Sequence, residues 1–312
     1  MKLFLGVDGG QSGTTAMIGD GTGRILGTGE AGPCNHAAAG EGRGKLERAI
    51  AGSVGEACRQ AGLDAAAVRF EAECFGMSGG PEDKREILAA MLRVDRLVVT
   101  NDAVIALAGA TRTGQGIITI AGTGSIAFGR NPAGRSARAG GWGHIFGDEG
   151  GGFDIARQAA RAVLRLEEGW GPPTALREVL LAATASENAN QMLHRFYTDE
   201  WPRSRVATLA RLVDRAAEES DAVALGIMQG AARQLAMLAG AVREELWSPG
   251  SAVELAYIGG VFQSRILLES FSGLVEAHEW VRCGSPLRGP AEGALREAYR
   301  SVGLEWGMEA GG

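Results

Sequence analysis

The first third of the chain alternates short apolar runs with longer segments of helical spacing. Residues 4–8, 69–77 and 96–100 are short and apolar, as buried strands are, and residues 44–61 repeat apolar side chains at helical intervals. The run at 96–100 leads directly into a helical pattern that starts at Asp102. Repetition of strand, crossover helix and strand predicts a mixed α/β sheet.

The rest of the chain is richer in helical patterns. One further strand is predicted at residues 252–258, where it ends in Gly259 and Gly260. Helices are predicted at residues 148–168, 173–183, 187–195, 206–220, 221–246, 261–274 and 290–301.

A strand–turn–strand–turn–strand order occurs twice, about 110 residues apart. In the first copy a glycine-rich turn at residues 9–15 separates the strands at 4–8 and 16–18. In the second, Gly122-Thr123-Gly124-Ser125 separates the strands at 116–121 and 126–128. This duplication predicts two similar domains that face each other, each offering a hairpin to one shared phosphate chain.

The length of 312 residues leaves room for two domains with separate cores. We place the boundary near residues 111–115, with an N-terminal domain at 1–113 and a C-terminal domain with helical insertions at 114–289. The helix at 290–303 is expected to complete the first domain.

Composition excludes several classes of partner. The net charge is −6 and no basic patch is evident, which argues against nucleic acid. No signal segment and no run of about 18 apolar residues is present, so we expect a cytoplasmic protein without a membrane partner. The four cysteines form no CxxC pair and no zinc spacing, and we expect reduced thiols.

The turn that follows the first strand has the residue types of a magnesium–phosphate site. Asp8 ends the strand, glycines follow, and Ser12 and Thr14 supply hydroxyls. A carboxylate can hold hydrated Mg²⁺, while glycine lets backbone N–H groups approach phosphate oxygens. A plain glycine-rich hairpin has the same sequence, and no Walker motif is present. The second turn has similar glycine and hydroxyl content, so the pair is more specific than either member.

Asn101 and Asp102 come directly after the strand at 96–100. Asp102 is either the N-cap of the next helix or a general base that takes a proton from a substrate hydroxyl. A carboxylate near phosphate is the usual base for phosphoryl transfer to a hydroxyl.

Residues 140–152 (GGWGHIFGDEGGG) carry seven glycines in thirteen positions. One interpretation is an irregular loop in which Asp148 and Glu149 start the next helix. The other is a sugar-binding loop, in which acidic groups accept hydrogen bonds from neighbouring hydroxyls. Gly259 and Gly260 suit either a tight strand–helix turn or close packing on an adenosine, and Asn35 suits either a turn or a sugar contact.

Taken in order, the segments GVDGGQSGTT, CNH, MSGG, TNDA, AGTGS, GGWGHIFGDEGGG and YIGGV resemble the N-acetylglucosamine kinase branch of the actin-like sugar kinases. This branch is of the BadF/BadG/BcrA/BcrD ATPase type. The resemblance runs from Gly6 to about Gly293, and GGWGHIFGDEG is its most specific part. It implies an α/β fold of two ribonuclease-H-like domains, with ATP in an interdomain cleft and a hexosamine between the lobes. It also implies a homodimer.

The resemblance further implies the role of each site residue. Asp102 is the catalytic base that activates the 6-hydroxyl, and Asp8 orients Mg²⁺. The residues expected to bind ATP are Asp8, Gly9, Gly10, Gln11, Ser12, Gly13, Thr14, Thr123, Gly124, Ser125, Gly259 and Gly260. Those expected to bind the amino sugar are Asn35, Ser78, Gly79, Thr123, Trp142, Gly143 and Asp148.

Several alternatives stay open. Gln11 stands where many members of the branch have glycine, and the acyl-group selectivity is not fixed. N-acetylglucosamine is the expected substrate, with glucosamine and N-acetylmuramic acid as alternatives. A neighbouring branch activates 2-hydroxyacyl-CoA dehydratases through an iron–sulfur cluster, and a non-catalytic sugar sensor could also use this fold.

Overall fold

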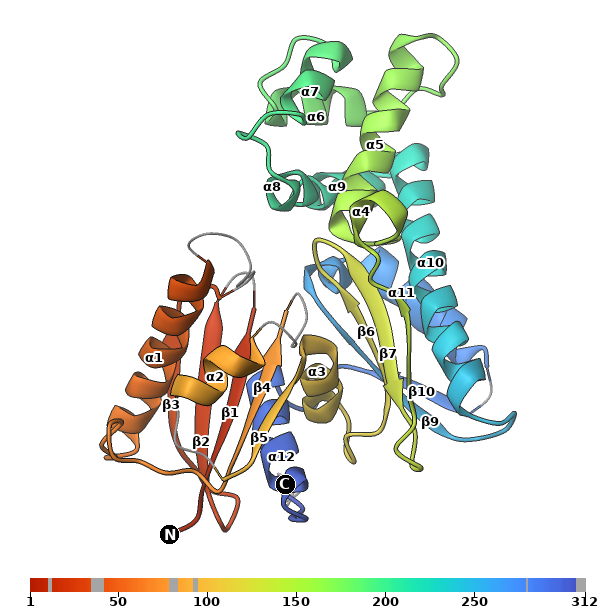
Figure 1. The fold of residues 1–312 in the computed structure, drawn as a ribbon. Helices are drawn as coiled ribbons and strands as arrows, with labels where there is room; N and C mark the ends of the chain where they lie inside the picture. Colours follow the sequence, from red (N-terminus) through yellow and green to blue (C-terminus); the bar gives the residue numbers. More distant parts are fainter. Residues whose placement is uncertain (11–12, 35–41, 79–83, 92–94, 279, 307–312) are drawn as a thin grey trace. The chain divides into compact units, whose positions relative to one another are not determined.

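A computed structural model describes residues 1–10, 13–34, 42–78, 84–91, 95–278 and 280–306 (Figure 1). Contacts divide the chain into two compact units. Unit 1 is Met1–Gln115 together with Pro286–Gly312, and unit 2 is Gly116–Ser285. Each unit holds one five-stranded sheet with helices packed on it, so the predicted α/β class is confirmed.

The sheet of unit 1 has the order β3-β2-β1-β4-β5. The meander β1–β2–β3 is antiparallel, whereas β4 and β5 continue the sheet in parallel with β1. The parallel part is what the alternation of strand and helix in the sequence predicts. The strands are β1 Leu3–Gly9, β2 Thr14–Asp20, β3 Ile25–Ala31, β4 Ala72–Met77 and β5 Leu97–Asn101.

Two hydrophobic clusters lie on opposite faces of this sheet. One joins Leu5 and Val7 of β1 to α1 Gly42–Gln60 and α2 Arg85–Met91. The other joins Phe4 of β1 to α3 Asp102–Ala110 and α12 Pro290–Ser301, because successive strand residues point to opposite faces. The helix near the end of the chain therefore packs within the first unit (Figure 1).

The sheet of unit 2 repeats this arrangement, with the order β10-β9-β6-β7-β8. Its meander β6–β7–β8 is antiparallel, and β9 and β10 continue the sheet in parallel. The short strand β10 was not predicted. The strands are β6 Gly116–Ala121, β7 Ser125–Arg130, β8 Ser136–Gly140, β9 Val253–Ile258 and β10 Val281–Gly284.

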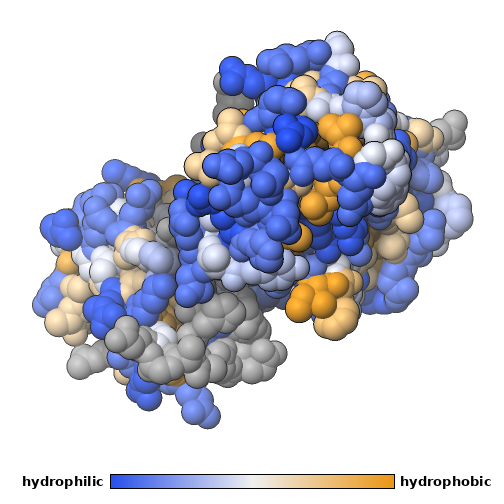
Figure 2. Space-filling model, turned by 90° about the horizontal axis from the view of Figure 1, so that it is seen from above, coloured by the Kyte–Doolittle hydropathy of each residue, from blue (hydrophilic) through white to orange (hydrophobic). Residues whose placement is uncertain are grey.

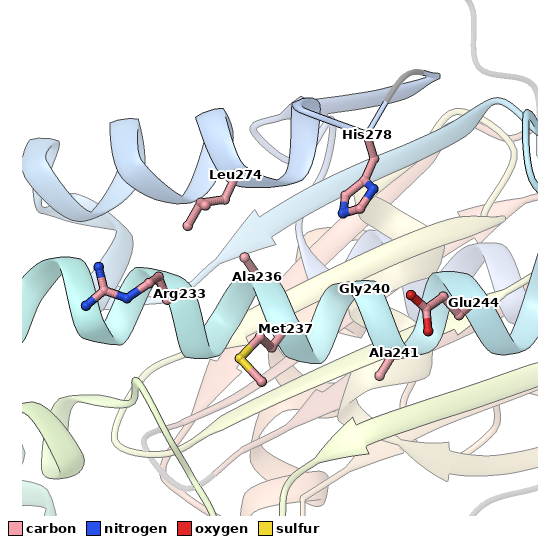
Figure 3. A pocket seen from close by; sticks show the side chains of 8 residues that line it. All are labelled: Arg233, Ala236, Met237, Gly240, Ala241, Glu244, Leu274 and His278. Carbon is pink, nitrogen blue, oxygen red and sulfur yellow. The ribbon is translucent and has the colours of Figure 1, made fainter.

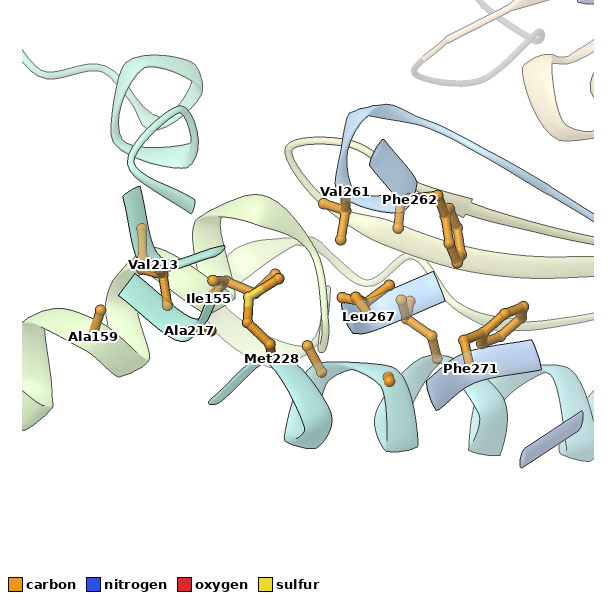
Figure 4. Packing of buried hydrophobic residues seen from close by; sticks show 14 of the residues in the cluster. Ile155, Ala159, Val213, Ala217, Met228, Val261, Phe262, Leu267 and Phe271 are labelled. Atoms are coloured by element: carbon orange, nitrogen blue, oxygen red, sulfur yellow. The ribbon is translucent and has the colours of Figure 1, made fainter. Parts of the chain in front are cut away.

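The longest helix of unit 2, α10, lies against the sheet and packs against α5, α9 and α11. Its inner side joins the core shown in Figure 4. By length and composition α10 alone among the described helices could cross a membrane, but its buried residues belong to this core. The helices are α4 Gly143–Phe146, α5 Gly152–Glu167, α6 Leu176–Ala183, α7 Ala189–Arg195, α8 Arg203–Ala207, α9 Ala210–Glu218, α10 Ala222–Leu246, the 3-10 turn η1 Gly260–Gln263 and α11 Arg265–Glu276.

Three helix predictions in unit 2 were wrong in detail. The helix predicted at 148–168 begins only at Gly152, because Asp148 has a left-handed backbone with φ 63° and cannot start it. The helix predicted at 206–220 is divided into α8 and α9. The helix predicted at 261–274 is interrupted at Ser264, whose side chain caps α11 by accepting from the N–H of Leu267.

Candidate functional site

The parallel register of unit 1 brings three strand ends to one edge of the sheet. Gly9 of β1 lies beside Met77 of β4, and Met77 lies beside Asn101 of β5. The residues next to these ends, Asp8, Ser78 and Asp102, therefore gather at the same edge. In α/β sheets this edge, at the carboxyl ends of the strands, is where ligands bind.

Asp102 and Asp8 form an acidic pair at this edge. The Ser78 hydroxyl donates to Oδ2 of Asp102 at 2.7 Å. Burial, and then the negative charge of Asp102, raise the pKa of Asp8 to about 6. The N-cap of α3 is Asn101, whose side chain accepts from the N–H of Val104, so the carboxylate of Asp102 is not used for capping.

The first glycine-rich turn connects β1 to β2. The N–H of Gly10 donates to the carbonyl of Gly13 at 2.9 Å, and Gly9 packs against Cys34 and Met77. The side chain of Thr14 is buried and its hydroxyl donates to the carbonyl of Gly32, so this hydroxyl is engaged within the protein. Four predicted site residues lie outside the described residues, namely Gln11, Ser12, Asn35 and Gly79.

The second glycine turn, Gly122–Ser125, joins β6 to β7 and is bound along its length to the loop at 140–152. The carbonyl oxygens of Gly122 and Thr123 accept from the N–H groups of Gly152 and Phe153 at 2.8 and 3.0 Å. The hydroxyl of Ser125 donates to the carbonyl of Glu149 at 2.6 Å. Two segments that the sequence assigned separately to phosphate and sugar are thus one structure.

Glycine is required where these two segments touch. A Cβ on Gly151 would strike the backbone of Gly124, and a Cβ on Gly124 would strike Asp148 and Arg203. This close contact accounts for Gly151, and a left-handed backbone accounts for four further glycines of the loop, Gly140, Gly141, Gly143 and Gly150. The Thr123 side chain, at the tip of the second glycine turn, is half-buried. Its hydroxyl forms no hydrogen bond to another described residue.

Asp148 connects the loop to the turn. One carboxylate oxygen accepts from the N–H of Ser125 at 3.3 Å, and the other pairs with Nη2 of Arg203. Asp148 is 5% exposed, whereas the Arg203 side chain is 34% exposed. Arg203 was not predicted, because it lies 55 positions away and no motif surrounds it.

Trp142 and Gly143 begin α4, at the opposite end of the glycine-rich loop. The Trp142 ring is 64% exposed, and the guanidinium of Arg138 lies 4.4 Å from its centroid. Ile145 and Phe146 are also largely exposed. Figure 2 shows a face that is mainly hydrophilic with separate hydrophobic patches. The exposed indole of Trp142 has the flat apolar surface on which a ligand could stack.

Gly259 and Gly260 follow β9, the parallel neighbour of β6. Gly259 has φ 118° and packs against the backbone of Ala121, the residue before the second glycine turn. A larger residue would be strained there and would push the two strand ends apart. Gly260 is exposed. The adenosine motif inferred from the sequence thus lies beside Gly122–Ser125 at one edge of the sheet.

The residues present suit a hydrated magnesium ion. Within the described ranges no three His, Cys, Asp or Glu side chains are grouped, so an all-protein metal cage is not formed there. Mg²⁺ usually keeps several waters and uses one or two carboxylates together with substrate phosphates. The repulsion between Asp8 and Asp102 is the kind that a cation relieves.

Comparison with known proteins places the chain in one family. The model of the BadF/BadG/BcrA/BcrD ATPase family matches residues 5–295. A relative from Clostridium acetobutylicum, named N-acetylmuramic acid/N-acetylglucosamine kinase, is 35% identical over 272 residues, which is 85% of this chain and 87% of the relative. The N-acetyl-D-glucosamine kinase of Dictyostelium discoideum is 30% identical and covers 86% of this chain and 88% of its own.

Solved structures agree on the fold. A structure from Chromobacterium violaceum, named "Putative N-acetylglucosamine Kinase", has a TM-score of 0.77 at 26% identity and covers 95% of this chain and 98% of its own. A ROK family glucokinase from Streptomyces griseus has a TM-score of 0.56 at 21% identity. The match covers 96% of this chain and 99% of the glucokinase. The resemblance inferred from the sequence is confirmed.

Proposed function

The chain belongs to the BadF/BadG/BcrA/BcrD ATPase family and is an ATP-dependent sugar kinase, and we propose that it phosphorylates N-acetylglucosamine at the 6-hydroxyl. The observation that carries the proposed reaction is the position of Asp102, while the choice of N-acetylglucosamine is supported by the names of the two relatives. Its carboxylate is free of helix capping, lies at the carboxyl edge of the sheet and is oriented by Ser78. A base for a sugar hydroxyl needs these properties.

Asp102 takes the proton of the attacking hydroxyl through its carboxylate. The hydrogen bond from Ser78 fixes the direction of one oxygen and leaves the other available. Asp8 would hold Mg²⁺ through its carboxylate, and the ion, when bound, would neutralise negative charge on the phosphate oxygens. Phosphoryl transfer depends mainly on positioning and charge stabilisation, so few side chains need to react.

The phosphates of ATP would be held by backbone N–H groups and hydroxyls of the two glycine turns. Thr123 is the best placed hydroxyl, since those of Thr14 and Ser125 are already engaged. Gly259 and Gly260 would face the adenosine. The proposed ATP set is Asp8, Gly9, Gly10, Gln11, Ser12, Gly13, Thr14, Thr123, Gly124, Ser125, Gly259 and Gly260.

In unit 2 the sugar would lie on the exposed indole of Trp142, with hydroxyls donating to Asp148. Asp148 uses one lone pair for Ser125 and one for Arg203, and an ionised carboxylate has about four, so about two remain for sugar hydroxyls that reach the small exposed part of its carboxylate. The proposed sugar set is Asn35, Ser78, Gly79, Thr123, Trp142, Gly143 and Asp148. We expect the reaction to take place in the cytoplasm, where ATP is supplied.

Arg203 favours N-acetylmuramic acid as a second candidate substrate. Its guanidinium has five N–H donors, and within the described residues one of them is hydrogen-bonded, to Asp148. The lactyl carboxylate of N-acetylmuramic acid is a suitable acceptor for the remaining donors. The dehydratase-activator alternative has less support, because Cys34, Cys58 and Cys74 are buried and a cluster shared between subunits needs accessible thiols.

A panel of acceptors with ATP tests the proposal. Wild type and Asp102→Asn are assayed with N-acetylglucosamine, N-acetylmuramic acid, glucosamine and glucose in a coupled ADP assay, and the product is located by NMR. We expect 6-phosphorylated N-acetylglucosamine from the wild type and little product from the variant. Equal activity of both proteins, or a product phosphorylated elsewhere, would contradict the proposed mechanism.

A further inference from the structure

The first turn of α5 holds the second glycine turn in place. The N–H groups of Gly152 and Phe153 donate to carbonyl oxygens of that turn at 2.8 and 3.0 Å. Free N–H groups at the start of a helix often bind anions, but these two are already engaged within the protein. The start of α5 is therefore a support for its neighbours, and any contribution it makes to ligand binding is indirect.

Two side chains at the start of α5 reach the glycine-rich loop as well. Asp154 accepts from the N–H of Gly150 through Oδ2 at 3.1 Å, and from Nη2 of Arg157 through Oδ1 at 2.6 Å. Nη1 of Arg157 donates to the carbonyl of His144 at 3.3 Å. One continuous network therefore joins His144 to Gly150, at the two ends of the segment that contains Asp148.

This network is largely enclosed by protein. Asp154 is 7% exposed, and the Nε of Arg157 is buried with no hydrogen-bond partner among the described residues. A buried charge needs a partner, and hydrogen bonds between charged groups are stronger than neutral ones. The ring of His144 packs edge-on against Phe153, with 5.2 Å between the ring centroids. Charge and packing thus both attach α4 to the first turn of α5.

The segment between α4 and α5 depends on support of this kind. Asp148 has φ 63°, a conformation that a residue with a side chain keeps only where its surroundings determine it. Gly143 and Gly150 also have positive φ, and glycine allows many other backbone conformations. Without contacts at both ends, the segment would have several conformations available to it.

We propose that Asp154 and Arg157 are positioning residues for the amino sugar. The proposal rests on the proposed function, in which Trp142 and Asp148 bind that sugar. Asp154 and Arg157 themselves do not touch it; their ion pair keeps the intervening segment in its binding conformation. When only a fraction of a protein has the binding conformation, its apparent affinity falls by that fraction. Loss of the pair should therefore raise the KM for sugar and leave kcat nearly unchanged, because saturating sugar selects the binding conformation.

A double-mutant cycle in the kinase assay tests the pair. Wild type, Arg157→Gln, Asp154→Asn and the double variant are compared with N-acetylglucosamine and ATP. We expect each single change to raise the KM for sugar about tenfold, as loss of one hydrogen bond to a charged group would. The double variant should also show a rise of about tenfold, because two residues that act as a unit are not additive. The KM for ATP should stay unchanged, since the N–H groups of α5 still hold the second glycine turn.

Hydrogen exchange gives a measurement that does not depend on catalysis. The N–H groups of Gly147, Gly150 and Gly151 are hydrogen-bonded within this segment or to Asp154. We expect a peptide that covers residues 143–151 to exchange faster in Arg157→Gln than in wild type, because the segment opens more often. Saturating N-acetylglucosamine should slow the exchange in both proteins.

Two exposed arginines provide matched controls. Arg161 lies one turn further along α5, and Arg233 lines the groove between α10 and α11 (Figure 3). Neither forms an ion pair with a residue that the structure describes, so replacement of either by glutamine should leave both KM values unchanged. Thermal melts identify any variant that does not fold. Asp154→Asn can still accept from the N–H of Gly150, so it tests the pair even if Arg157→Gln does not fold.

Three results would overturn the proposal while the proposed function stands. Lower melting temperatures with an unchanged KM for sugar would mean that Asp154 only caps α5. A fall in kcat as large as the rise in KM would give the pair a role in the reaction itself. A rise of about 100-fold in the double variant would mean that the two residues act separately. A wild type that phosphorylates no amino sugar would instead contradict the proposed function, and this proposal with it.

Discussion

Replacing Asp148 by asparagine tests whether the glycine-rich loop at 140–152 and the second glycine turn, Gly122–Ser125, act as one structure. Asparagine tolerates the left-handed backbone at this position, where φ is 63°, and its amide oxygen can still accept from the N–H of Ser125. It cannot form the ion pair with Arg203. The substitution therefore removes charge from the site with little change in shape.

The magnitude follows from the hydrogen bonds that change. A bond to a charged group contributes about 1.5–3 kcal/mol, against about 1 kcal/mol for a neutral one. The difference is about 0.5–2 kcal/mol for each bond, so with two sugar hydroxyls affected the KM for sugar should rise roughly 5- to 700-fold. The KM for ATP should rise about fivefold, because a weaker Asp148 holds Ser125 and the turn less firmly. Asp148→Ala should raise the KM for sugar about tenfold further, because alanine in a left-handed backbone costs about 1–2 kcal/mol.

Initial rates give the KM for sugar when sugar is varied at saturating ATP, and the KM for ATP when ATP is varied at saturating sugar. Arg205→Gln is the control, because Arg205 lies two residues further along α8, is 49% exposed and pairs only with the surface residue Glu200 among described acidic groups. It should leave both constants unchanged. A rise in the sugar KM alone would refute the coupling between loop and turn, and no rise in either would remove Asp148 from binding.

Three further outcomes are expected. Asp102→Asn should lower kcat by about 10²–10⁴-fold with the sugar dissociation constant changed little, and a near-normal kcat would exclude Asp102 as the base. Asp8→Ala should lower turnover at saturating Mg²⁺ while calorimetry still detects sugar binding; wild-type turnover would assign the turn another role. Glu73 is fully buried on β4, its carboxylate oxygens have no hydrogen-bond partner among the described residues, and burial raises its pKa to about 8. The folded protein therefore keeps a proton that the unfolded chain releases above about pH 4.5, so the free energy of unfolding should fall by up to about 1.4 kcal/mol per pH unit between pH 5 and 8. In Glu73→Gln, urea unfolding at pH 5 and 7.5 should show this fall removed, and an unchanged slope would contradict the assignment.

The sheets were predictable because their signals are local. A strand that ends in Asp8 and Gly9, or in Ala121 and Gly122, must turn within a few residues, and the glycines show where. The repeated strand order then predicts the repeated topology. The short strand β10 carried no such signal, since its four residues include an arginine and a glycine at the edge of the sheet.

The start of α5 was predicted wrongly because its cause is distant in sequence. Acidic residues before a helical pattern normally start a helix, and Asp148 with Glu149 fits that rule. In the folded chain Asp148 instead bonds to Ser125 and Arg203, at separations of 23 and 55 residues, and these bonds hold it in a left-handed conformation. Tertiary contacts determined the backbone where local propensity pointed to a helix.

The same distant contact changes how the chemistry of the loop is understood. A sequence can show that a carboxylate lies in a glycine-rich loop. It cannot show that both oxygens of this carboxylate already accept hydrogen bonds from other parts of the protein. Because Ser125 and Arg203 already contact its two oxygens, Asp148 in its proposed role would bind the sugar and support the Gly122–Ser125 turn at the same time. Binding of the acceptor and positioning of the donor would then depend on one side chain, so the affinity for each substrate would change when the other is bound.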